Sequence, residues 1–135
     1  MLIMMDLHII LYMSTMREDY SDERMEILLE EFTRDNKKNN ITGFMLYYER
    51  NIIQCIEGRK EDIYRLYDNI ENDPRHFLII KLMDERISKR NFIDWDLAFK
   101  KITYEQFESF SLNKLTSNKK VRVFFKQFLT SFSNN

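Results

Sequence analysis

The chain has 135 residues, enough for one domain with a single core and too few for two ordinary domains. Hydrophobic residues make up 44% and aromatic residues 14%, which excludes a disordered chain, and two glycines with one proline exclude long flexible linkers. A net charge of −1, from 21 basic and 22 acidic residues, gives no strong positive field, so we expect no nucleic acid among the partners.

The first predicted element is a strand over residues 8–14, which are apolar on both faces and therefore belong in the centre of a sheet. The apolar stretch around it, residues 1–13, carries Asp6 and His8 and has no leading lysine or arginine. This stretch is too short to span a bilayer and lacks the charged head of a signal peptide. We therefore expect no association with a membrane.

The next predicted element is an amphipathic helix that begins after Ser21, a good N-cap, and ends near residues 39–40. Asp22 and Glu23 are acids that suit its first turn. Its apolar residues recur at i, i+3, i+4 and i+7, which predicts one buried face, made of Met25, Leu28, Leu29 and Phe32.

A hairpin is predicted after this helix. Residues 42–48 and 51–57 are strand-like runs separated by Glu49 and Arg50, although this turn lacks the usual glycine. We expect Gly58 to mark the exit from the second of these strands.

A second amphipathic helix is predicted over about residues 60–72, and Asp73-Pro74 stops it. Two apolar runs after it, residues 77–83 and 95–99, predict a fourth and a fifth strand. The apolar stripe of the second helix has the same spacing as that of the first and consists of Ile63, Leu66, Tyr67 and Ile70.

This order of elements predicts an α+β fold, a ferredoxin-like βαββαβ mixed sheet with two helices on one face. We expect residues 1–100 to form this core and residues 101–135 to form a C-terminal helical cap on the other face. An aromatic stripe in the last predicted helix suits packing on that face, and a partner-binding surface is the alternative. The stripe consists of Val121, Phe124, Phe125, Phe128 and Phe132.

The signals of common catalytic and metal sites are absent. The chain has neither a glycine-rich phosphate loop nor a Gly-x-Ser-x-Gly motif, and His8 and His76 lack a zinc-ligand spacing. Cys55 is the single cysteine, which excludes an internal disulfide and favours the cytoplasm. It lies inside an apolar strand, where we expect an inert core residue, so we predict neither an enzyme nor a bound metal.

Three polar residues occur at positions that the pattern assigns to the interior. Gln54 interrupts the apolar run of residues 52–56, Tyr12 lies near the end of the first strand, and Asn36 continues the buried helical stripe. A buried amide without partners costs about 1–3 kcal/mol, so each should have a hydrogen-bond partner. Taken singly, each is best explained by a bond to nearby backbone or by a place at a strand edge.

Taken together, these positions belong to a series of short motifs that occur in a fixed order. The motifs are Leu11-Tyr12-Met13-Ser14, Arg17 to Asp22, Asp35-Asn36, Ile41-Thr42-Gly43, Gln54 to Gly58, Asp73-Pro74-Arg75-His76, and Phe92 with Trp95. In this order, from about residue 8 to residue 99, they resemble the BLUF family, sensors of blue light using FAD. Each motif is weak alone, and the ordered set is highly specific.

The resemblance implies that FAD is held non-covalently between the two helices. By that resemblance, Leu28 and Ile70 sandwich the isoalloxazine ring, and His76 lies against it. Asn36 and Arg75 would hydrogen-bond the edge of the ring, with Asp73 steadying Arg75.

The resemblance further implies that Tyr12 and Gln54 form the photoactive pair. In the family's mechanism, tyrosine supplies an electron and a proton, and their return leaves the glutamine in a new hydrogen-bond state. A glutamine amide suits this role because it has one donor end and one acceptor end. Signal relay would then pass to the last strand at Trp95 and Leu97.

Three positions depart from the family pattern. Phe32 stands where a small residue is usual, so its ring would crowd the pocket at a cost of about 1–3 kcal/mol unless neighbours adjust. Asp35 stands where histidine or asparagine is usual and adds a negative charge near the cofactor. Leu97 replaces a common methionine.

Two readings of the function stay open. The first is a single-domain blue-light receptor that signals to an unknown downstream protein or through rearrangement of a homo-oligomer. The alternative is a degenerate BLUF-like interaction module that binds flavin poorly or not at all. A small ferredoxin-like enzyme is the weakest interpretation, because no suitable phosphate loop is present. FAD is favoured over FMN only by the resemblance.

Overall fold

The computed structural model describes residues 6–92 and 96–112, and its elements follow the predicted order. They are β1 (Leu7–Met16), α1 (Asp22–Lys38), β2 (Thr42–Tyr48), β3 (Asn51–Arg59), α2 (Lys60–Glu71), β4 (His76–Ile87), β5 (Asp96–Lys101) and α3 (Tyr104–Leu112).

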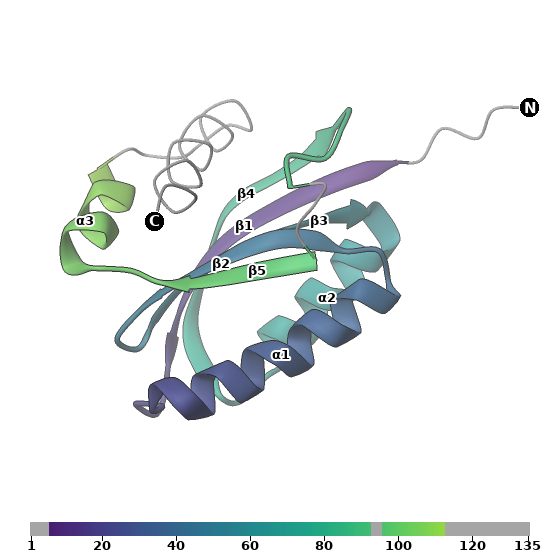
Figure 1. Cartoon of the computed structure of the whole chain (residues 1–135). Coiled ribbons are helices and arrows are strands. Elements are labelled where there is room, and N and C mark those ends of the chain that lie inside the picture. The colour runs from purple at the N-terminus through teal and green to yellow at the C-terminus, as the bar shows by residue number, and fades with distance from the viewer. Residues whose placement is uncertain (1–5, 93–95, 113–135) are drawn as a thin grey trace, which may run out of the picture.

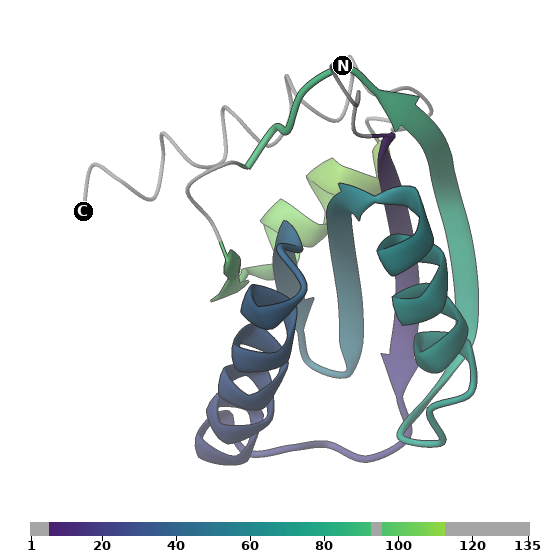
Figure 2. The same ribbon diagram turned by 90° about the vertical axis from the view of Figure 1, so that its right-hand side faces the viewer.

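The five strands form one mixed sheet in the order β4-β1-β3-β2-β5. β1 pairs antiparallel with both β3 and β4, and β2 pairs antiparallel with β3, whereas β5 runs parallel to β2. Helices α1 and α2 lie side by side on one face of this sheet (Figures 1 and 2). The predicted α+β, ferredoxin-like fold is confirmed.

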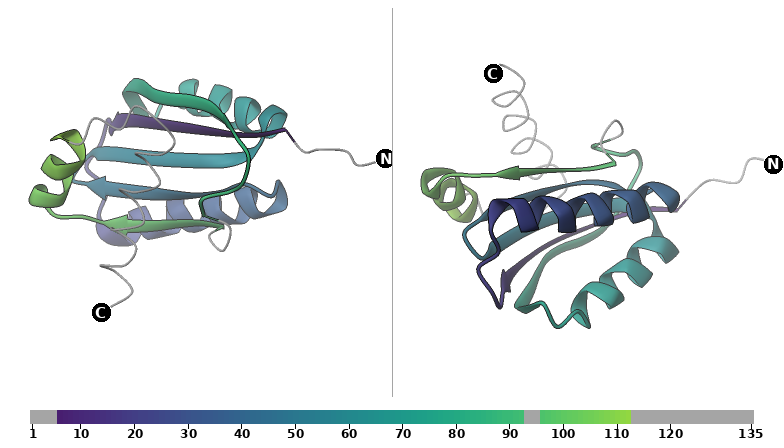
Figure 3. Two further views of the ribbon diagram at one scale, coloured as in Figure 1. Left: turned by 90° about the horizontal axis from the view of Figure 1, so that it is seen from above. Right: turned by 60° about the horizontal axis from the view of Figure 1, so that its bottom comes forward.

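Alternation along the central strands divides the core into two layers. Ile9 and Leu11 of β1 point to the face away from the helices, where Phe107 of α3 also packs. Ile10 and Tyr12 point to the helical face, where they pack with residues of α2. Figure 3 shows the same arrangement from above and from below, with both long helices on one side of the strands.

The local signals at the ends of α1 act as predicted. The Ser21 hydroxyl accepts a hydrogen bond from the Arg24 amide at 3.1 Å, so Ser21 is the N-cap. Asn39 is the C-cap. In the hairpin, Glu49 has a φ of 51°, which explains how the β2–β3 turn closes without a glycine.

The prediction for the end of β3 is wrong. Gly58 does not mark the exit from β3, because it pairs with His8 of β1 and the strand continues to Arg59. β4 is also longer than predicted and includes the charged segment Asp84–Arg86, since β1 supplies backbone partners along that whole length.

The predicted division into a core over residues 1–100 and a cap over residues 101–135 stays a prediction. β5 ends at Lys101 and α3 begins at Tyr104. The aromatic stripe of the last predicted helix lies outside the described residues. Within the described ranges, no helix is both long enough and apolar enough to cross a membrane.

Candidate functional site

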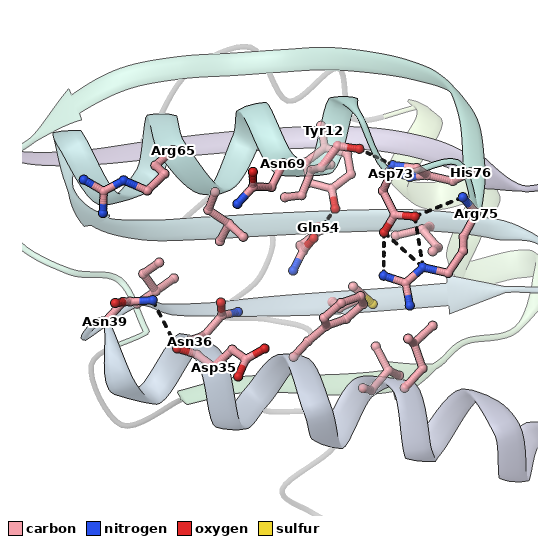
Figure 4. Close-up of a pocket in the computed structure, with 18 of the residues that line it drawn as sticks. Tyr12, Asp35, Asn36, Asn39, Gln54, Arg65, Asn69, Asp73, Arg75 and His76 are labelled. Atoms are coloured by element: carbon pink, nitrogen blue, oxygen red, sulfur yellow. Dashed lines mark hydrogen bonds and ion pairs between the residues drawn. The ribbon is translucent and has the colours of Figure 1, made fainter.

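A cavity of about 830 Å³ lies between α1 and α2, with the sheet as its floor (Figure 4). The turn between α2 and β4 closes one of its ends. Every residue predicted from the sequence to bind a cofactor lines this cavity, namely Tyr12, Leu28, Phe32, Asp35, Asn36, Gln54, Ile70, Arg75 and His76. Residues from five separate elements and one turn are thus brought to one place.

The floor of the cavity carries a hydrogen-bonded pair, Tyr12 and Gln54. The two residues are direct cross-strand partners in the antiparallel β1–β3 ladder, and both side chains face the helices. The Tyr12 hydroxyl donates to Oε1 of Gln54, and the two residues are only 3% and 4% exposed. The Gln54 amide nitrogen points away from Tyr12, into the cavity (Figure 4). The amide therefore accepts from the phenol and offers a donor to a bound group.

Burial holds Tyr12 in its protonated form. Desolvation raises the pKa of the Tyr12 phenol above its ordinary value, and the nearby Tyr67 and Asp73 raise it further. The Tyr67 ring lies edge-on to the Tyr12 ring, with 5.9 Å between their centroids. A protonated phenol is the state that can donate to Gln54.

The wall formed by α1 presents an apolar side chain and an amide to the cavity. Leu28 and Asn36 are 9% and 5% exposed, and their spacing of eight residues puts them on one helical face. The Asn36 carbonyl accepts from the Asn39 and Ile41 amides as the helix ends, while its side-chain amide points into the cavity (Figure 4). Asp35 is exposed at the rim.

The turn after α2 holds Arg75 at the end of the cavity. Arg75 donates from Nε and Nη2 to the two carboxylate oxygens of Asp73, at 2.9 and 2.6 Å. The hydrogen bond from Arg75 lowers the pKa of Asp73, and the same bond raises the pKa of Arg75. The Arg75 guanidinium lies 5.2 Å from the centroid of the Phe32 ring, so it bridges the turn to α1.

His76 ties the floor to the end of α2. Its Nε2 lies 2.5 Å from the Ile70 carbonyl and its Nδ1 lies 2.9 Å from the Ser14 hydroxyl. A carbonyl can only accept, so Nε2 donates, and in the neutral imidazole Nδ1 accepts from Ser14. His76 therefore positions Ile70, which itself lines the cavity.

Sequence reasoning missed the polar end of the cavity that lies opposite Arg75. Arg65 and Asn39 mark this end, and Asn69 points into the cavity from α2 (Figure 4). Lys38 lines the cavity as well. The signal for Asn69 was present, because it lies three residues after Leu66 and therefore on the same helical face.

The predicted relay residues are not tested by these contacts. Leu97 belongs to β5, which pairs with β2 and not with β3. Trp95 lies outside the described residues, so the relay through these two positions stays a prediction. Across residues 6–92 and 96–112, no group of three histidine, cysteine or acidic side chains is placed to hold a metal ion.

Comparison with known proteins gives a consistent result. Residues 7–98 match the family model described as "BLUF: Sensors of blue-light using FAD". The chain is 29% identical over 83 residues to the "Blue light- and temperature-regulated antirepressor BluF" of Escherichia coli (strain K12), a match covering 62% of this chain and 21% of that protein. It is 29% identical over 110 residues to the "Photoactivated adenylate cyclase subunit beta" of Euglena longa, covering 73% of this chain and 13% of that protein. The chain thus matches only a small part of each relative.

Solved structures agree with this fold. The dark-state structure of BlrB, named as a BLUF protein, superposes with a TM-score of 0.73 at 25% identity, covering 91% of this chain and 97% of that chain. The photo-activated state of BlsA also gives a TM-score of 0.73, at 24% identity, over 90% of this chain and 93% of that chain.

Proposed function

The chain belongs to the BLUF family, sensors of blue light using FAD, and on that basis we propose that it is a blue-light receptor that binds FAD non-covalently between α1 and α2. The cavity volume of about 830 Å³ lies within the range of roughly 300–1,000 Å³ that is usual for small-molecule sites. Leu28 and Ile70 supply apolar walls on opposite helices, as a flat aromatic ring requires. The residues present therefore fit a flavin.

The hydrogen-bonding groups also suit the edge of an isoalloxazine ring, which carries carbonyls and an imide. Asn36 offers both a donor and an acceptor, while the Gln54 amide nitrogen and Arg75 offer donors. When bound, the flavin would absorb blue light and supply one-electron redox chemistry. The Asp73–Arg75 ion pair would keep the guanidinium oriented while it binds a carbonyl.

The single observation that carries this proposal is the buried bond from Tyr12 to Gln54. In this bond the Tyr12 hydroxyl is the donor and Oε1 of Gln54 is the acceptor. A rotation of the amide would reverse which end of Gln54 faces the phenol, whereas a net shift of one amide proton from Nε2 to Oε1 would reverse which end donates. Because both side chains are buried, water cannot easily replace their hydrogen bonds, so the return of the amide to its original arrangement should be slow.

FAD is our proposal for the flavin, and the polar end of the cavity supports it. Lys38 and Arg65 line the cavity, and so does Asp62, which lies 3.5 Å from Arg65. The two cations suit the diphosphate that FAD carries and FMN lacks. A solved structure of BlrP1 from Klebsiella pneumoniae is described with FMN, so FMN is the competitor to test. Equilibrium binding of FAD, FMN and riboflavin to the purified protein separates the three.

We propose that the described domain acts as a sensor and not as an enzyme, and that its output goes to a separate protein or to a second copy of the chain. The antirepressor and cyclase activities named for its relatives belong to those longer proteins. A cytoplasmic location and a homo-oligomeric state stay predictions.

An absorption spectrum before and after blue illumination tests the proposal. Purified protein reconstituted with FAD should be yellow, and light should shift its flavin bands reversibly to the red. Gln54→Leu should keep the flavin and lose the shift, whereas Tyr64→Phe, on a half-exposed tyrosine that does not line the cavity, should retain it. An intact shift in Gln54→Leu would remove Gln54 from its proposed role.

One observation favours the alternative of an interaction module without flavin. The Phe32 ring lies beside Arg75 and so competes for the guanidinium that a flavin carbonyl would need. Protein that stays colourless after incubation with FAD would support this alternative.

A further inference from the structure

A carboxylate is fully buried in the sheet, on the face away from the proposed flavin site. Glu57 of β3 is 0% exposed. Its Oε1 accepts from the Thr42 hydroxyl at 2.8 Å and from the Phe92 amide at 2.6 Å. Its Oε2 accepts from the Asn91 backbone amide at 2.8 Å and from the Asn91 side chain at 3.3 Å. A carboxylate is tolerated in an interior only with such a full set of donors.

Apart from the Thr42 hydroxyl on β2, the donors come from a single loop. Asn91 and Phe92 lie between β4 and β5, and the preceding Arg90 adds two further bonds from Nη1, to the Thr42 hydroxyl at 3.0 Å and to the Glu57 carbonyl at 3.2 Å. Three consecutive loop residues thus donate hydrogen bonds to one neighbouring pair of strand residues, Thr42 of β2 and Glu57 of β3. Phe92 is 2% exposed and stacks on Phe44, with 6.2 Å between the ring centroids.

This attachment lies shortly before the fifth strand in the chain. β5 starts four residues after Phe92, and it is an edge strand whose backbone partner is β2. Because only three residues separate Phe92 from Asp96, fixing Phe92 limits the positions that the first residue of β5 can take. Loss of the Glu57 contacts would therefore free residues 90–92 and leave the start of β5 held by its pairing with β2 alone.

Glu57 also lies close to Gln54 along the same strand. Gln54 pairs with Tyr12 and Met45, and Glu57 pairs with Ile9 and Thr42, in two ladders that run through these positions without a register shift. Both neighbouring strands hold the segment between them, so we expect residues 54–57 to shift together. A displacement of β3 at Gln54 thus changes the donor distances at Glu57, where hydrogen bonds weaken steeply once their geometry departs from the ideal.

We propose that Glu57 is a positioning residue that latches the loop before β5 to the centre of the sheet, and that rearrangement of Gln54 in the light releases this latch. The second half of this inference rests on the proposed function. The latch is a two-state element of the kind that converts a small local shift into a movement elsewhere. It offers a route from the helical face of the sheet to β5 on the other side of β2.

The test compares Glu57→Gln with Glu30→Gln in the whole 135-residue chain loaded with FAD. Glu57→Gln preserves size but turns one acceptor into a donor that opposes the loop amides, whereas Glu30→Gln makes the same charge change on the exposed side of α1. Backbone amide hydrogen exchange over residues 88–92 is measured in the dark and under blue light, together with the absorption spectrum.

In the parent protein and in Glu30→Gln, we expect light to speed exchange over residues 88–92 by about tenfold or more. In Glu57→Gln, exchange should already be fast in the dark and gain nothing from light, while the red shift keeps its full size. A purely structural role would instead raise dark exchange and leave the light-induced difference in place. That outcome, or dark exchange equal to the parent's, overturns the proposal.

A second variant covers the case in which Glu57→Gln does not fold. Thr42→Val removes one donor to Glu57 and one contact of Arg90 and leaves the carboxylate its loop amides. In Thr42→Val, the exchange rate over residues 88–92 in the dark should lie between the rates of the parent protein and of Glu57→Gln, and the light-induced difference should be smaller. An exchange rate equal to that of the parent would refute the latch. Protein that takes up no FAD refutes the proposed function and the light-driven release with it, whereas dark exchange alone still decides whether Glu57 holds the loop.

Discussion

The bond between Tyr12 and Gln54 can be tested without any cofactor, by a double-mutant cycle on the stability of the apo protein. Gln54→Leu leaves the Tyr12 hydroxyl without its acceptor in a position only 3% exposed, and Tyr12→Phe leaves Oε1 of Gln54 without its donor in a position 4% exposed. An unpaired buried polar group costs about 1–3 kcal/mol, so each single variant should lose about that much free energy of unfolding.

The double variant Tyr12→Phe/Gln54→Leu removes both polar groups at once and leaves apolar groups of similar size. We therefore expect it to be no less stable than either single variant, which corresponds to a coupling energy of about 1–3 kcal/mol. Urea unfolding followed by circular dichroism measures these values, provided that the slope of the free energy against urea stays constant.

The control pair is Tyr64→Phe with Gln54→Leu. Tyr64 is 42% exposed on α2 and does not line the cavity, so its effect should add to that of Gln54→Leu within about 0.5 kcal/mol. If the Tyr12 and Gln54 effects were also additive, the two side chains would not interact in solution, and the photoactive pair proposed here would lose its structural basis.

Three further predictions concern the cavity, the sheet and acid stability. Phe32→Ser should raise the fraction of protein that binds FAD, because it relieves crowding and frees the Arg75 guanidinium; unchanged or lower occupancy by absorbance would show that the ring is accommodated. Gly43→Ala should cost about 2–4 kcal/mol in urea unfolding, since its Cβ would lie 2.1 Å from the Cys55 carbonyl oxygen, whereas Gly58→Ala, with 3.4 Å to its nearest neighbour, should cost far less; equal losses would contradict this reasoning. The hydrogen bond from Arg75 lowers the folded-state pKa of Asp73, so its stabilisation is present above about pH 4 and is lost as the pH falls through the lowered value. Asp73→Asn should therefore flatten the acid side of the stability curve, and an unchanged curve would show that the ion pair contributes nothing.

Local signals in the sequence were sufficient for the helices and for the buried polar residues. Ser21 caps α1 through a donor three residues away, and the apolar spacing of both helices depends only on near neighbours. Gln54 and Asn36 could be recognised as special because an amide at an interior position is costly wherever its partner lies. The same patterns placed Leu28 and Ile70 on the faces that line the cavity.

Local sequence patterns could not predict the contacts between segments that are far apart in the chain. Glu57 is one of many acidic residues in the sequence, and its hydrogen-bond partners lie 15, 34 and 35 residues away along the chain. The inclusion of Gly58 in β3 and the polar end of the cavity at Lys38 and Arg65 likewise depend on which strands and helices become neighbours.

The sequence by itself therefore determined the order of the elements, their buried faces and the presence of buried polar residues, because each follows from periodicity or from the cost of burying a polar group. That Tyr12 and Gln54 bond to each other followed only from the resemblance to the BLUF family. Only the tertiary structure decided that Glu57 accepts hydrogen bonds from the loop before β5 and that the Arg75 guanidinium lies over the Phe32 ring. The physical reason is that strand pairing brings together residues far apart in the chain, and no local preference encodes which donor a buried acceptor will find.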